Sequence, residues 1–326
     1  MDVKKLSIDA QEHAAKLGEL KKEIGKIIVG QGDIIEEVLL SLISGGHILL
    51  EGVPGLAKTL MLKSLAECIN AKYSRIQFTP DLLPADITGT KIFNTRDSSF
   101  STRKGPIFSN FILADEINRA PPKVQSALLE AMQEMQVTIS GDTYAIEPPF
   151  FVMATQNPIE TEGTYRLPEA QIDRFMFKLL ITYPAIKEEQ EIITRMTEGV
   201  SYQVKRVLTI KELLSVQGFV PKVYADDKIK RYIAEIVDAT RHPDAYKLEL
   251  NGLIEYGASP RASIWLMLAG KAHALLNRRG YVIPEDIKSV AHCVLRHRII
   301  TTYEAEAEGI TSDMIIDKIL QKVKVP

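Results

Sequence analysis

The sequence predicts an α/β fold, with a doubly wound domain built on a parallel sheet and a second domain made of helices. Through residues 46–183, short apolar runs alternate with segments whose apolar residues have helical spacing, as in a sheet with helices on both faces. A turn rich in glycine joins the first apolar run to the helix that follows it. From residue 185 onward the spacing is helical only. We therefore expect a ligand site at the carboxyl ends of the strands in the first domain.

Composition places the chain among globular proteins. Its 326 residues, 45% hydrophobic and 25% charged, are enough for two domains. The formal net charge of −2 gives no sign of a polyanionic partner. Cys68 and Cys293 lack zinc-site spacing, which favours a reducing compartment without a cysteine metal site. Residues 1–10 lack the apolar core of a signal peptide, and no apolar run reaches about 18 residues. We expect a cytoplasmic location without a membrane span.

We expect three segments along the chain. They are an N-terminal helical segment over residues 1–27, an α/β core over 28–184 that contains the expected ligand site, and an all-α domain over 185–326. An apolar stripe along the first segment predicts a helix that packs on the core. Asp33 and Glu36 have the spacing of a capping box at the start of the next apolar-periodic run.

The glycine-rich turn has the composition of a phosphate-binding loop. It follows the apolar run 48–50 and ends where a helical pattern opens at Lys58 and Thr59. A triphosphate needs several backbone N–H groups that point inward, and small residues let the chain turn tightly enough to supply them. Lys58 is then within reach of the β- and γ-phosphates, and the Thr59 hydroxyl is a ligand of Mg²⁺. The predicted nucleotide contacts here are Gly52, Val53, Pro54, Gly55, Leu56, Ala57, Lys58, Thr59 and Leu60.

One position departs from the usual pattern G-x-x-x-x-G-K-[ST]. Counted from Gly52, the glycine before the lysine is Ala57. We expect the chain to be entering right-handed helix there, a conformation that alanine accepts. The alternative interpretation of the whole segment is a chance glycine turn before an ordinary helix.

Two carboxylates follow a second predicted strand. Residues 111–114 are apolar or small, and Asp115 and Glu116 come next, at the strand end that opens onto the ligand crevice of a parallel sheet. Carboxylates are costly in a closed core and favourable beside a metal-bound triphosphate. We assign Asp115 to the Mg²⁺ site and Glu116 to the attacking water as general base. A strand that ends in surface carboxylates is the alternative.

A third strand, predicted over residues 150–154, leads to Asn157. An amide at this strand end is able to orient water against the γ-phosphate. The alternative is an asparagine that makes a turn before Pro158.

The intervening segments predict further elements. Residues 75–78 predict a strand, and the prolines and glycine of 79–89 predict an ordered turn or insertion rather than a helix. Hairpins are expected over 91–102 and 137–146, with a helix over 123–135 between them.

The remaining elements complete the core and fill the second domain. Pro168 opens a short helix, and residues 178–183 predict the last strand of the core. Helices are then expected at about 187–198, 209–217, 226–241, 260–277 and 284–297.

The order of these motifs resembles that of AAA+ ATPases, in particular the MoxR family of the branch with an insertion in its second helix. Six segments carry the resemblance: residues 52–59, 78–89, 113–122, 154–158, 167–175 and 257–261. Ala57 belongs to the pattern of that family. The resemblance implies a P-loop NTPase core with a five-stranded parallel sheet, an all-α lid, and ATP and Mg²⁺ as cofactors.

The resemblance also implies roles for individual polar residues. Asn157 corresponds to sensor 1. Arg174 corresponds to the arginine finger, which reaches the γ-phosphate of the neighbouring subunit; its alternative is a surface arginine paired with Asp173. Arg261 corresponds to sensor 2, and its alternative is an arginine at a helix end. Arg119 contacts either nucleotide or neighbour, or has no such role.

The segment Val29, Gly30 and Gln31 resembles the one that lies along the adenine, where the backbone recognises the base.

The resemblance implies a homo-oligomer in the form of a hexameric ring. It also implies a chaperone-like remodeller of protein clients, among which proteins with a von Willebrand factor A domain are expected. A finger that acts in trans makes the isolated subunit a poor ATPase, because its charge is worth about 10³–10⁵ in rate.

Two other functions stay open. Related AAA+ branches include helicases, and Lys91, Arg96, Arg103 and Lys104 make the inserted segment basic. The tip of the second hairpin, however, has no lysine or arginine to follow a phosphate backbone, so we do not expect nucleic acid as a partner. The third hypothesis is a nucleotide-gated scaffold without turnover, which Glu116 speaks against.

Overall fold

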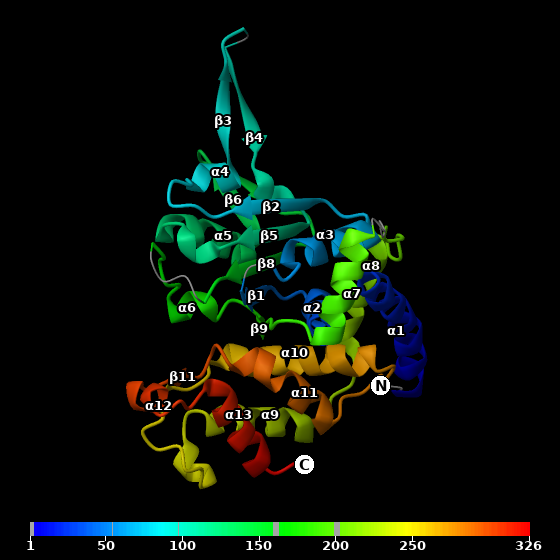
Figure 1. Cartoon of the computed structure of the whole chain (residues 1–326), viewed down its shortest axis with the longest axis vertical. Helices are drawn as coiled ribbons and strands as arrows, with labels where there is room; N and C mark the ends of the chain where they lie inside the picture. Colours follow the sequence, from blue (N-terminus) through cyan, green and yellow to red (C-terminus); the bar gives the residue numbers. More distant parts are fainter. Residues whose placement is uncertain (1–2, 54, 97, 159–162, 199–202) are drawn as a thin grey trace.

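The chain forms an α/β core with a hairpin that projects from one end and a layer of helices at the other (Figure 1). The computed structural model describes residues 3–53, 55–96, 98–158, 163–198 and 203–326. Within these residues, no helix has the length and apolar character needed to cross a membrane.

Five parallel strands form the central sheet, which confirms the predicted fold class. They are β1 (Ile48–Glu51), β2 (Tyr73–Gln77), β5 (Phe111–Asp115), β8 (Phe151–Gln156) and β9 (Phe177–Leu180), in the spatial order β2-β5-β8-β1-β9. Leu50 pairs with Thr155, and Leu113 pairs with Met153. Because of this register, the carboxyl ends of β1, β5 and β8 meet at one edge of the sheet.

Helices cover both faces of the sheet because the strands alternate apolar side chains between two cores. One face packs against α2 (Gly32–Ile43) and α3 (Lys58–Ile69), in the cluster that holds Leu50 and Leu65, and α1 (Val3–Gly25) packs on these two helices. The opposite face packs against α5 (Pro122–Glu134), in a second cluster that holds Leu49 and Leu128. The N-terminal apolar stripe is buried, as predicted: Leu17, Leu20 and Ile24 are at most 1% exposed.

Two local predictions in the core were wrong. The segment 79–89 contains a short helix, α4 (Pro84–Thr88), with Pro84 in its first turn, where a proline has no hydrogen bond to lose. The capping box at Asp33 does not form, because α2 already begins at Gly32 and no side chain caps it. Asp33 instead lies in the first turn of that helix.

Both predicted hairpins are present. β3 (Gly89–Asn94) pairs with β4 (Ser99–Lys104), and this hairpin projects from the core in Figure 1. β6 (Gln136–Ile139) pairs with β7 (Asp142–Ala145). Lys91 of the first hairpin forms an ion pair of 2.8 Å with Asp142 of the second, so the base of the first hairpin contacts the tip of the second.

The C-terminal part contains the five predicted helices, together with a helix over residues 312–322 and a small strand pair that the sequence analysis did not predict. The strands are β10 (Ile254–Tyr256) and β11 (Ile300–Thr301), which are too short to show a period of two. The larger helices are α7 (Ile186–Thr197), α8 (Ile210–Phe219), α9 (Asp227–Ala239), α10 (Pro260–Leu276), α11 (Pro284–Leu295) and α13 (Ser312–Lys322). The smaller helical turns are α6 (Glu169–Ile172), α12 (Tyr303–Ala307), η1 (Pro106–Phe108), η2 (Ile117–Arg119), η3 (Val220–Lys222) and η4 (Pro243–Tyr246).

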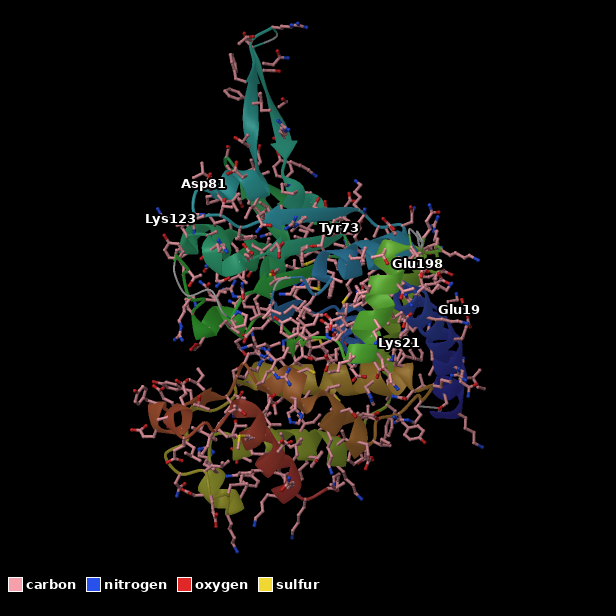
Figure 2. The ribbon with its side chains drawn as sticks, viewed as in Figure 1. Glu19, Lys21, Tyr73, Asp81, Lys123 and Glu198 are labelled. Carbon is pink, nitrogen blue, oxygen red and sulfur yellow. The ribbon has the colours of Figure 1, made fainter. Side chains whose placement is uncertain are left out.

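We call residues 227–322, from α9 to α13, the helical layer. In Figure 1 it lies below the sheet, with α10 running along the core. Figure 2 shows that side chains fill the space between α10 and the core ribbon. In contrast, α8 lies against the core, where Gln217 Nε2 donates to the Leu42 carbonyl (2.7 Å). The division of the chain at residue 184 stays a prediction.

Candidate functional site

A cavity of about 450 Å³ opens at the carboxyl edge of the sheet. It lies between the glycine-rich loop and the ends of β2, β5 and β8. Its lining residues are Gly52, Gly55, Leu56, Ala57, Lys58, Thr59, Leu60, Arg75, Asp115, Glu116, Thr155, Gln156 and Asn157. The structure therefore brings the loop, the two carboxylates and the asparagine together, as the sequence predicts.

Backbone geometry adapts the loop to this position. Gly55 has a φ of +87°, which favours glycine. Gly52 packs so closely on the strand-end residue Ile181 that a Cβ would lie 2.1 Å from its Cγ2 atom. Pro54 lies outside the described residues, and Val53 is half-buried. The loop therefore packs against the sheet at Gly52, and at Gly55 it makes a turn that favours glycine.

Helix α3 begins at Lys58 without a side-chain cap. The first N–H groups of a helix have no partners within it, and here they belong to residues that line the cavity. The Lys58 ammonium donates to the carbonyl of Gly52. Burial lowers the pKa of Lys58, while Asp115 and Glu116 oppose the shift. The amino end of α3 is therefore a cationic wall of the cavity.

Ala57 corrects one prediction. It has φ 53° and ψ 22°, which is left-handed, whereas we expected right-handed helix. Ala57 joins the loop to the first turn of α3. This position therefore has the left-handed conformation that favours the glycine of the usual phosphate-loop pattern. A left-handed conformation costs a residue with a Cβ roughly 1–2 kcal/mol, and the loop therefore contains local strain.

Thr155 contacts both acidic residues. Its hydroxyl donates to Asp115 Oδ1 (2.7 Å) and accepts from the backbone N–H of Glu116 (2.9 Å). Arg75 forms an ion pair of 2.6 Å with Asp115 from the next strand. Glu116 has φ 55° and ψ 51°, a second left-handed residue at the cavity. Strained backbone of this kind occurs often at functional sites.

Two further groups hold the Glu116 side chain. Gln77 Nε2 donates to Glu116 Oε2 (3.0 Å), and Arg119 Nε lies 2.8 Å from the same oxygen. Sequence reasoning did not identify Arg75, Gln77 or Thr155. A usable signal existed, because all three are polar residues close to the carboxyl ends of strands that neighbour β5.

Asn157 lies at the boundary of two cavities. Besides the first, it lines a second cavity of about 430 Å³ between the sheet edge and the helical layer, together with Lys178 and Arg296. Lys178 pairs with Glu51 (2.7 Å) at the end of β1. The amide is therefore placed between the strand ends and the helical layer.

The segment expected to lie along the adenine borders a different cavity. Gly30 and Gln31 line a space of about 850 Å³ between the N-terminal helices and α7. Gln31 Nε2 donates to the carbonyl of Thr182 (3.1 Å). A Cβ at Gly30 would lie 2.6 Å from the Glu188 carboxyl group. Val29 is half-buried and does not line this space.

The two predicted catalytic arginines do not line the loop cavity. Arg174 is half-buried, and its Nη1 donates to the carbonyl of Leu129 (2.9 Å). Arg261 is exposed at the start of α10, with Nη1 3.3 Å from Asp173 Oδ2. Both residues lie beyond the strand ends, near the contact between the core and the helical layer.

The donor atoms of the loop cavity fit a magnesium ion bound with phosphates. Mg²⁺ prefers oxygen ligands, takes one or two carboxylates from the protein and completes its shell with waters and phosphate oxygens. The Thr59 hydroxyl and the Asp115 carboxylate line the same cavity. Within the described chain, no group of three or more histidine, cysteine, aspartate or glutamate side chains is arranged to hold a metal by itself.

Comparison with known proteins adds a family context. Residues 47–177 match the model of the ATPase family associated with various cellular activities (AAA), and residues 250–319 match that of an AAA lid domain. Chaperone MoxR1 of Mycobacterium tuberculosis is 48% identical over 306 residues, which is 93% of this chain and 81% of that protein. YeaC, an uncharacterised protein of Bacillus subtilis, is 48% identical over 95% of both chains.

More distant relatives and a solved structure agree. Protein MoxR of Paracoccus denitrificans is 29% identical and covers 96% of this chain and 97% of its own. A crystal structure of a protein from Cytophaga hutchinsonii, 50% identical, superposes with a TM-score of 0.93 over 100% of this chain and 99% of that one.

Proposed function

The chain belongs to the MoxR family of AAA ATPases, and from this premise we propose that it binds and hydrolyses ATP with Mg²⁺ to remodel partner proteins. One observation carries the proposal. Lys58 and Thr59 at the start of α3, Asp115 and Glu116 at the end of β5, and Asn157 just after β8 line one cavity, and each supplies a chemical group that phosphoryl transfer to water requires.

The loop and α3 bind the triphosphate. Backbone N–H groups at the start of α3 and the Lys58 ammonium contact the phosphate oxygens. Thr59 and Asp115 would hold Mg²⁺, which would neutralise phosphate charge when bound. Arg75 and Thr155, each within 2.7 Å of the Asp115 carboxylate, keep that side chain in place.

Glu116 activates the attacking water. Its carboxylate accepts the proton as the water oxygen bonds to the γ-phosphorus, and the bond to ADP breaks. Asn157 orients the water through its amide. Gln77 and Arg119 hold the Glu116 carboxylate at 3.0 Å and 2.8 Å, which limits the positions that the base can take.

A second copy completes the site. Arg174 and Arg261 do not line the loop cavity of their own chain, and we assign them to the cavity of a neighbouring subunit. Head-to-tail contacts of this kind close into a ring when the rotation permits, and a hexamer is the ring that we propose. Arg174 then supplies positive charge to the γ-phosphate of the neighbour as it leaves.

The partner that we propose is a protein rather than a nucleic acid. The relative from M. tuberculosis is named a chaperone, and a protein with a von Willebrand factor A domain is one client to test. Within the basic insertion, Lys91 is paired with Asp142 and Lys104 lies over the Phe108 ring, 4.7 Å from its centroid. These internal contacts weaken the case for a phosphate backbone as ligand.

Phosphate release from MgATP tests the activity. We expect turnover that EDTA abolishes, and a fall of about 10²–10⁴-fold in Glu116→Gln, the range that a general base contributes. Glu67→Gln, an exposed carboxylate on the outer face of α3, is the matched control and should keep the native rate. A Glu116→Gln variant that turns over at the native rate would favour the scaffold hypothesis instead.

Affinity capture tests the client. The Glu116→Gln variant should hold ATP without hydrolysis, so a remodelled protein stays bound to it. We expect a partner that is recovered with ATP and lost without nucleotide. Equal recovery in both conditions would contradict an ATP-driven remodeller, and release by nuclease would indicate a nucleic-acid motor.

A further inference from the structure

The helical layer grips the chain on both sides of Arg174. Arg298, just after α11, donates through Nη2 to the carbonyls of Asp173 (2.9 Å) and Phe175 (2.6 Å). Its Nη1 donates to the carbonyl of Met176 (3.1 Å). His297 adds a bond from Nε2 to Phe175 (3.1 Å). One short piece of the helical layer thus binds the backbone immediately before and after Arg174.

Asp173 binds the same layer through its side chain. Arg298 Nε donates to Asp173 Oδ1 (2.8 Å), and the Ser259 hydroxyl donates to Oδ2 (2.9 Å). Arg261 approaches Oδ2 at 3.3 Å. The carboxylate therefore joins two places in the helical layer, the start of α10 and the end of α11.

Arg174 itself points the other way. Its Nη1 donates to the carbonyl of Leu129 in the middle of α5, 2.9 Å away. The backbone of the segment is fixed from the helical layer, whereas the side chain extends from the opposite side. This arrangement leaves the position of the guanidinium dependent on where the helical layer holds residues 173–176.

From this geometry we infer that Arg298 and Asp173 are positioning residues for the arginine finger, so that the orientation of the helical layer sets the reach of Arg174. The inference rests on the proposed function of Arg174. Its consequence is that a shift of the helical layer in one subunit changes hydrolysis in the next subunit.

The chemistry of Arg298 supports a role beyond filling space. It exposes 1% of its side chain, and burial lowers its pKa to about 10 although Asp173 opposes the shift. A buried ion pair is often no more stabilising than apolar side chains of similar volume. The planar fork of arginine, however, binds several carbonyls in fixed directions, which is what a device that orients backbone requires.

Steady-state turnover of the assembled protein tests the inference. Arg298→Gln should lower kcat by about 10²-fold, the effect of misplacing a catalytic group by roughly 1 Å, with nucleotide affinity unchanged. Arg298→Lys, which keeps the charge but not the fork, should restore part of the loss. Asp173→Asn, nearly the same shape without the charge, is the milder variant if Arg298→Gln fails to fold.

Arg279 provides a matched control. It is also an arginine paired with a buried carboxylate, with Nη1 2.7 Å from Asp286 Oδ2, but both partners belong to the helical layer. Arg279→Gln should lower the thermal midpoint while kcat stays native. If Arg298→Gln and Arg279→Gln lose stability alike and neither loses kcat, the inference is wrong.

Mixing subunits separates this inference from the proposed function. Arg298→Gln subunits keep an intact cavity, and Glu116→Gln subunits keep an intact finger, so a mixture should exceed the summed activity of the two alone. No gain on mixing would place the Arg298 defect in its own cavity and overturn the inference. A native rate in Arg174→Ala would instead refute the finger, and with it the proposed role in trans.

Discussion

The loop cavity and the segment around Arg174 are built in different ways. In the cavity, side chains from the loop, β5 and β8 converge because parallel strands end at one edge of the sheet. At Arg174, the backbone is held by residues of the helical layer, and the guanidinium does not reach the cavity. The comparison teaches that the loop and the strand topology bring the groups of the cavity together, whereas the backbone around Arg174 is held by a contact between distant parts of the chain.

The difference extends to electrostatics. Lys58 lies in a cavity open to a ligand, and two carboxylates nearby oppose the lowering of its pKa by burial. Arg298 is buried and bonded to one carboxylate and a set of backbone carbonyls of its own chain. The first arrangement suits an anion that enters and leaves. The second suits a permanent structural contact.

The Arg174→Ala substitution has the largest expected effect. If turnover did not fall, the contrast between the cavity and the Arg174 segment would be wrong. Arg174→Ala should lower ATP turnover of the assembled protein by about 10³–10⁵-fold, because the charge acts on the transition state. Nucleotide affinity, measured by fluorescence titration, should stay native, since Arg174 does not line the cavity of its own chain. Arg231→Ala, exposed on α9, is the control. Equal loss of affinity and turnover would mean that Arg174 binds nucleotide in its own subunit.

Acid should weaken the core through His47. Burial lowers its pKa to about 4, and Nδ1 accepts from the N–H of Val152 (3.1 Å). The unfolded chain binds the proton first, so stability present above pH 6.5 is lost as pH falls toward 4, by about 3 kcal/mol. Urea unfolding at several pH values measures this slope.

The His47→Gln variant sharpens the comparison of regions. This variant should reduce the slope of unfolding free energy against pH by the share that His47 contributes. His297, half-buried where the helical layer meets the core, also has a pKa well below its usual value because of desolvation, so its share of the slope should remain. An unchanged slope in His47→Gln would show that the core does not set acid sensitivity.

Lys58→Ala should lower nucleotide affinity, which Arg174→Ala should leave native. A hydrogen bond to a charged group is worth about 1.5–3 kcal/mol, so we expect nucleotide affinity to fall by about 10–10²-fold. Lys63→Ala, exposed one turn further along the same helix, should bind as the native protein does. Native affinity in Lys58→Ala would exclude this cavity as the phosphate site.

Ala57→Gly has the smallest expected effect. Because Ala57 is left-handed, glycine should raise the free energy of unfolding by about 1 kcal/mol. Ala15→Gly, exposed in the middle of α1, should lower it by about 1 kcal/mol. Thermal unfolding distinguishes the two signs, and destabilisation by both substitutions would contradict the strain at Ala57.

The sequence predicted what depends on local pattern. Apolar runs marked the strands, and the polar residues directly after them marked the cavity, which is why Asp115, Glu116 and Asn157 were found. Thr155 was missed because its role depends on the register between β5 and β8, where it reaches both carboxylate residues.

The loop conformation and the long-range contacts account for the features that the sequence analysis did not predict. The left-handed turn at Ala57 is imposed by how the loop meets α3, and no propensity of alanine reveals it. The contact of Arg298 with Asp173 spans 125 positions of the chain. Only packing of the helical layer on the core brings these residues together, so composition and spacing carried no signal of it.

Mixing two inactive variants tests most directly whether neighbouring subunits share the site. Glu116→Gln subunits keep the finger and lose the base, and Arg174→Ala subunits keep the base and lose the finger. With sites completed in trans, about a quarter of the interfaces in an equal random mixture pair an intact base with an intact finger, and phosphate release should return to about that fraction of the native rate. A mixture that assembles and stays as inactive as its components would contradict shared catalysis.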